Sequence, residues 1–121
     1  MKQPPSKNTS RQFRIMFRKD QWIQVYIWRT QKEYKKQLAE LQYGKCATYI
    51  HYGNRNKKHS EFGIMHFSHK YLGAGCFAHE LQHFMFDWIS THLKEVNPRN
   101  EEKLAQLADD ITRLFWNNYY K

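Results

Sequence analysis

The chain has 121 residues, a net charge of +9 at pH 7 and an isoelectric point of about 9.6. Hydrophobic residues make up 40% and aromatic residues 17%, which argues against wholesale disorder and suffices for one domain with a modest core. No apolar run approaches the ~20 residues that span a bilayer, and the polar N-terminus shows no secretory signal. We therefore expect no membrane association, whereas the basic charge favours an acidic partner or nucleic acid as much as a solvated basic surface.

The first part of the chain predicts an arm and two strands. Residues 1–11 are polar and basic and include Pro4-Pro5, so we expect a disordered arm before a single domain over residues 12–121. Residues 13–17 alternate between apolar and polar side chains, and residues 22–28 are rich in β-branched and aromatic ones. Both patterns are typical of strands.

A helix and a hairpin are predicted next. Residues 31–43 place apolar side chains at helical spacing between good helix formers, and Gly44 is a suitable end. Residues 47–52 and 62–67 are two strand-like runs joined by a polar, basic connection, which indicates a hairpin.

Two helices are expected at the end of the chain. The window 73–93 contains no proline, has glycines only at its start, and carries apolar residues at helical spacing. Pro98 marks a break, and residues 101–120 again place apolar side chains on one helix face. The order β-β-α-β-β-α-α predicts an α+β fold in which a small sheet packs beside the two C-terminal helices.

The strongest functional signal is the string His79-Glu80-Leu81-Gln82-His83, an H-E-x-x-H motif within the predicted helix 73–93. Residues i and i+4 share a helix face, so His79 and His83 can bind one metal ion while Glu80 reaches a water on it. Shuffling a chain of this composition gives the string roughly 2% of the time. The motif predicts a zinc site for hydrolysis, and the alternative is two histidines that only pack on the helix surface.

Catalytic zinc usually takes a third protein ligand. His92 lies nine residues beyond His83, roughly 13 Å along one helix at ~1.5 Å per residue, and cannot join it. Glu101 and Glu102, at the start of the last helix, are the remaining candidates.

These motifs resemble the gluzincin metallopeptidases, which carry H-E-x-x-H on one helix and a zinc-binding glutamate on the next. Glu102-Lys103-Leu104-Ala105 is similar to the Glu-x-x-Ala pattern of their third ligand, which favours Glu102 over Glu101. Gln106 stands where some relatives have aspartate. Residues 47–120 as a whole also resemble small phage or prophage-encoded metallopeptidases.

The resemblance implies a zincin-like fold and a Zn²⁺ ion held by His79, His83 and Glu102. Glu80 would be the general base in the hydrolysis of a peptide or protein substrate. The strand 62–67 would bind the substrate by edge addition. A cytoplasmic location, in a bacterial or phage-infected cell, is implied as well.

Other candidate roles stay open in the sequence. The resemblance leads us to expect an oxyanion donor, and the candidates are His66, His69, Tyr71 and Tyr119. Asn100 and Asp87 are candidates for orienting a ligand imidazole, and each could instead be a helix cap or a surface polar residue. Cys46 and Cys76 form no C-x-x-C pair, so we expect reduced thiols, with Cys76 in the core rather than on the metal.

Two other classes of function compete with the hydrolase. A basic domain of this size can be a DNA- or protein-binding module that keeps the zinc site for structure or as a vestige. It can also be a structural domain with an accidental motif.

Overall fold

The computed structural model describes residues 11–38, 47–51, 61–93 and 95–121. Its elements are β1 (Arg11–Arg18), β2 (Gln21–Trp28), α1 (Gln31–Leu38), β3 (Ala47–His51), β4 (Glu61–Ser68), α2 (Ala74–His92) and α3 (Pro98–Tyr119). The predicted α+β class and element order are confirmed. Arg11 belongs to β1 rather than to the predicted arm, while the rest of that arm and the predicted helix end at Gly44 lie outside the described residues.

The four strands form one mixed sheet in the order β1-β2-β4-β3. Strands β1 and β2 pair antiparallel, β3 and β4 form the predicted antiparallel hairpin, and β2 and β4 pair parallel. Strand β4 is therefore paired on both edges, and β3 is an edge strand. The prediction that residues 62–67 bind a substrate by edge addition is wrong, because the parallel pairing with β2 occupies the edge that the hairpin leaves open.

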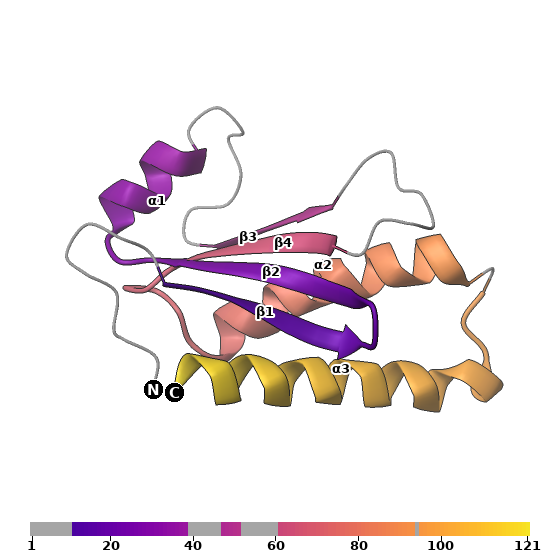
Figure 1. Ribbon diagram of the computed structural model, residues 1–121. Coiled ribbons are helices and arrows are strands. Elements are labelled where there is room, and N and C mark those ends of the chain that lie inside the picture. Colours follow the sequence, from indigo (N-terminus) through magenta and orange to yellow (C-terminus); the bar gives the residue numbers. More distant parts are fainter. Residues whose placement is uncertain (1–10, 39–46, 52–60, 94) are drawn as a thin grey trace.

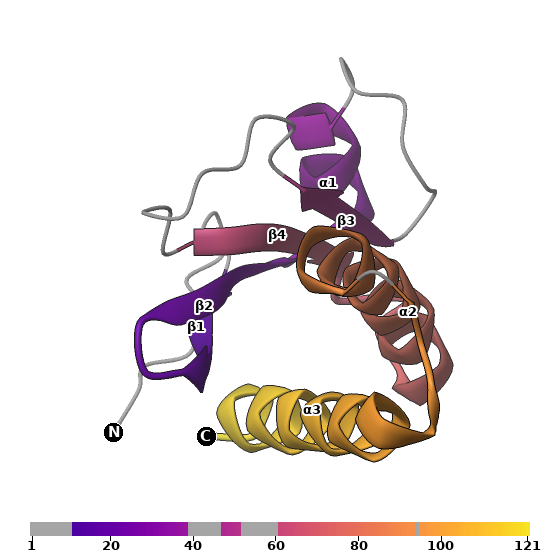
Figure 2. The same cartoon turned by 90° about the vertical axis from the view of Figure 1, so that its right-hand side faces the viewer.

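Helices α2 and α3 cover one face of the sheet, and α1 lies on the other (Figures 1 and 2). Strand β1 shows why: Phe13 and Ile15 are buried, while Arg14 and Met16, one residue on, are exposed on the opposite face. Helix α2 lies against β3 and α3 against β1, so the two helices meet over the middle of the sheet. Aromatic rings dominate this core, from Phe13 through Phe67 to Phe115.

Helix α3 starts earlier than the sequence predicted. Asn97 is its N-cap, accepting hydrogen bonds from the N–H groups of Arg99 and Asn100, and the Asn100 side chain accepts from the Asn97 N–H. Pro98 opens the helix, where its missing N–H costs nothing. Asn100 is thus a cap residue, which is one of the simpler roles predicted for it.

No helix among the described residues combines the length and apolar character needed to cross a membrane.

Candidate metal centre

Helix α2 has one side that packs against α3 and another that carries the two histidines of the motif. Phe77 stacks on Phe115 of α3 with ring centroids 4.2 Å apart, so this side of α2 is its α3 flank. At about 100° per residue, His79 lies roughly 160° and His83 roughly 120° round the helix from Phe77. The two histidines therefore lie on the opposite side, which we call the histidine flank.

His79 and His83 form a close pair on the surface. Both are exposed, and their Nε2 atoms lie 3.3 Å apart. Two nitrogens bound to one zinc ion at about 2.0–2.1 Å and a tetrahedral angle would be about 3.3 Å apart. The separation of this pair fits two ligands on one metal ion, and it equally fits a hydrogen bond between the two imidazoles.

Glu80 lies beneath the pair. It is only 4% exposed, and its Oε2 lies 3.9 Å from Nε2 of His79. Burial raises the pKa of the Glu80 carboxyl above its usual value, while His79, His83 and a hydrogen bond from the Tyr49 backbone lower it. A buried carboxylate with a raised pKa beside two imidazoles is suited to accept a proton.

Strand β3 anchors the histidine flank through Tyr49. Its backbone N–H bonds to Glu80, and its hydroxyl donates to Oδ2 of Asp87 at 2.6 Å. Gly63 makes room for this contact, since a Cβ there would meet the Tyr49 phenol at under 3 Å. Asp87, predicted to orient a ligand imidazole, cap a helix or lie on the surface, instead ties α2 to β3.

Glu102 is not brought to the histidine pair. It is exposed, as is Glu101, near the start of α3. That start lies beside the end of α2, since Trp88 and His92 line one cavity with residues of the first turns of α3. His92 is itself roughly 13 Å along the helix from His83. Within residues 11–38, 47–51, 61–93 and 95–121, no three His, Cys, Asp or Glu side chains gather to hold a metal ion.

Of the predicted oxyanion donors, His66 is built into the sheet. It is 7% exposed on β4 and accepts a hydrogen bond at Nδ1 from Nε1 of Trp28 at 2.9 Å. The rings of Tyr26 and Trp28 lie nearly parallel to its imidazole. Burial lowers the pKa of His66 to about 4, so it is neutral at pH 7 and structural.

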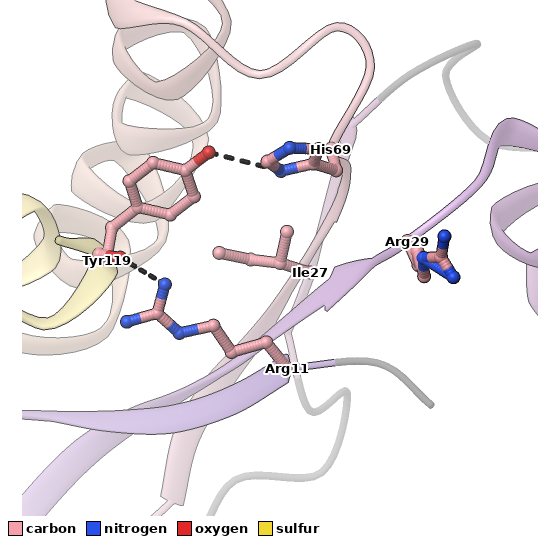
Figure 3. Close-up of a pocket in the computed structure, with 5 residues that line it drawn as sticks. All are labelled: Arg11, Ile27, Arg29, His69 and Tyr119. Atoms are coloured by element: carbon pink, nitrogen blue, oxygen red, sulfur yellow. Dashed lines mark hydrogen bonds between the residues drawn. The ribbon is translucent and has the colours of Figure 1, made fainter. Parts of the chain in front are cut away.

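His69 and Tyr119 belong to a different place in the fold. The Tyr119 hydroxyl lies 3.1 Å from Nδ1 of His69, beside a cavity of about 210 Å³ (Figure 3). Arg11 also lines this cavity and donates hydrogen bonds to the carbonyls of Asn118 and Tyr119 at the end of α3. Tyr119 is on α3 and so on the α3 flank, while Tyr71 is exposed in the turn before α2. The structure brings none of these groups into contact with the histidine pair.

Cys76 packs against the hydrophobic core, as predicted, and Cys46 lies outside the described residues. The residues that sequence reasoning missed are Tyr49 and its partner Gly63. An isolated glycine within a strand pattern signals a close approach of another group, so the Phe62-Gly63-Ile64 run carried a usable sign. The pairing of Tyr49 with Asp87 spans 38 positions and leaves no local pattern.

Comparison of the chain with protein-family models, with curated proteins and with solved structures finds no match.

Proposed function

We propose that this chain is a zinc-dependent hydrolase of peptide bonds whose metal is held by His79 and His83. The 3.3 Å separation of their two Nε2 atoms, above the buried Glu80, is the observation that supports this proposal. A hydrogen bond between the two imidazoles would give the same separation, so the buried carboxylate beside the pair is what favours a metal site over simple packing.

The donor set fits zinc at two positions. Neutral imidazoles are among the ligands that zinc prefers, and a catalytic zinc site keeps one position for water. Glu102 is the third ligand that the family resemblance implies, but it is exposed near the start of α3, beside the end of α2 that lies roughly 13 Å from His83. The proposal therefore rests on His79, His83 and Glu80 alone.

A zinc ion held here would supply Lewis acidity, activating water and polarising the scissile carbonyl. Glu80 would take the proton of the attacking water and pass it to the leaving amine. The Tyr49 N–H would hold the Glu80 carboxylate against β3, and the tie between Tyr49 and Asp87 would keep α2 at that distance.

The edge strand β3 lies beside the histidine flank and is the surface on which we expect an extended peptide to bind. Backbone hydrogen bonds to an edge strand provide affinity that does not depend on sequence. The Tyr49 N–H is already occupied by Glu80, so the peptide would use the remaining groups of the strand.

The test is hydrolysis of a fluorescence-quenched peptide library by protein loaded with one equivalent of Zn²⁺. We expect cleavage by the wild type and a loss of about 10²- to 10⁴-fold in Glu80→Gln, with zinc content unchanged. Gln82→Ala, an exposed change on the same helix, is the matched control and should keep its rate. Equal rates for Glu80→Gln and the wild type would contradict the role of Glu80. Stoichiometric zinc without cleavage would contradict the hydrolase and favour a binding module with a structural metal.

A further inference from the structure

A second cavity lies on the α3 flank of α2, away from the histidine pair. It has a volume of about 260 Å³ and is bounded by the β1–β2 turn, the end of α2 and the first turns of α3. Figure 1 shows these three segments at the same end of the molecule, and Figure 2 faces that end. Because Trp88 and Leu104 line it, this α2–α3 cavity is on the α3 flank and separate from the histidine pair.

The rim of the α2–α3 cavity is cationic. Arg18 from β1 and Lys103 from α3 both line it, and no aspartate or glutamate does. Neither Arg18 nor Lys103 forms an ion pair with another residue in the described ranges. Two positive charges from separate elements therefore face one space without a carboxylate to balance them.

The floor of the cavity is apolar. Leu104 and Leu107 on α3 line it, and Leu107 is 8% exposed. The Trp88 ring closes one wall, with the Arg18 guanidinium 4.7 Å from its centroid and the His92 ring 4.1 Å from it. Since these contacts occupy Trp88, an incoming apolar group would lie on the leucines.

We propose that the α2–α3 cavity binds a small organic anion. Its carboxylate or phosphoryl group would pair with Arg18 and Lys103, and its apolar body would lie on Leu104 and Leu107. The volume is just below the range of about 300–1,000 Å³ for drug-sized ligands, so a single ring with one acidic group is the right size. This inference does not depend on the proposed hydrolase.

Calorimetric titration of the full chain at low ionic strength tests the proposal, with phenyl phosphate and benzoate as probes. We expect saturable binding of at least one of them, and the preferred probe tells a phosphoryl from a carboxylate ligand. The neutral benzamide should not bind, and inorganic phosphate should bind more weakly than phenyl phosphate. Amide chemical shifts should move at Trp88, His92 and Lys103.

Two variants remove the charges without removing the core contacts. Lys103→Gln changes an exposed side chain, and Arg18→Met keeps an aliphatic stem over Trp88. We expect each to weaken binding about tenfold, whereas Lys36→Gln, on the exposed side of α1, should not. Binding unchanged in both variants, equal binding of benzamide, inorganic phosphate that binds as tightly as phenyl phosphate, or no saturable binding of either probe would overturn the proposal.

Discussion

The exposed histidine pair of α2 and the buried histidine of β4 place the same side chain in opposite surroundings. His66 is enclosed by aromatic rings, holds the Trp28 indole N–H and has its pKa lowered to about 4. The side chain of His79 is 70% exposed, and its Nε2 lies next to that of His83. Burial and a fixed partner make the first histidine structural, while exposure and mutual proximity leave the pair able to meet a metal ion.

The largest expected effect concerns the stability that neutral His66 provides. Its pKa is about 4 in the folded protein and about 6.5 when unfolded, so the unfolded chain binds more protons between these values. The contribution of His66 to the free energy of unfolding should thus be highest above pH 6.5 and fall by about 3 kcal/mol as the pH drops to 4.

His66→Asn isolates this effect, since an amide oxygen can accept from Trp28 without titrating. Glu80, whose pKa is raised, acts in the opposite direction, and it is present in both proteins. Urea unfolding from pH 7.5 to 4 should show the wild type losing about 3 kcal/mol more than the variant. Parallel pH curves would contradict the buried, neutral His66.

Beside the exposed histidine pair, the Tyr49 phenol is tightly packed against Gly63 and donates a hydrogen bond to Asp87. In Gly63→Ala, the added methyl group would push the phenol away from Asp87, at a cost of about 1–3 kcal/mol in the free energy of unfolding. Placing Gly63→Ala in a Tyr49→Ala background should reduce that cost below about 0.5 kcal/mol. A cost that persists in the second background would show that Tyr49 is not what Gly63 accommodates.

A smaller effect is expected from the histidine pair itself in metal-stripped protein. His79→Ala and His83→Ala remove exposed side chains, so each should change the free energy of unfolding by less than about 0.5 kcal/mol. Chemical denaturation with a chelator present measures this. Destabilisation by 2 kcal/mol or more in either variant, on the order of a core truncation, would mean that the pair is structural, like His66.

The smallest effect is expected from Glu102. Its exposed position near the end of α2 predicts that Glu102→Gln leaves zinc affinity within about twofold of the wild type, well under 1 kcal/mol. A competition titration against a chromophoric chelator would decide this. A loss of tenfold or more would instead establish Glu102 as the third ligand, and would require α3 to lie differently against α2.

Local patterns carried much of the fold. Alternation in β1, the apolar run of β2 and the helical spacing of residues 73–93 follow from period and propensity, so the element order could be predicted. The H-E-x-x-H spacing likewise predicted that His79 and His83 share a helix face, which their 3.3 Å separation confirms.

The pairing of strands that lie far apart in the chain could not be predicted from the sequence. The parallel contact of β2 with β4 joins segments separated by a helix and a strand, and it decides that β3 rather than β4 is an edge. The same limit applies to Glu102, because a motif fixes its place on a helix but not which flank of α2 that helix covers. His66 is a further example, since a strand-like run does not reveal that the Trp28 indole N–H will donate to its imidazole.

The central claim is that His79 and His83 bind zinc together, and a zinc titration of tag-free, metal-stripped protein tests it most directly. We predict one equivalent of Zn²⁺ per chain for the wild type and an affinity weakened by more than about tenfold in both His79→Gln and His83→Gln. His69→Gln, an exposed histidine beside Tyr119, should bind as the wild type does. Zinc binding that is absent in the wild type, or unchanged in the two α2 variants, would contradict the claim.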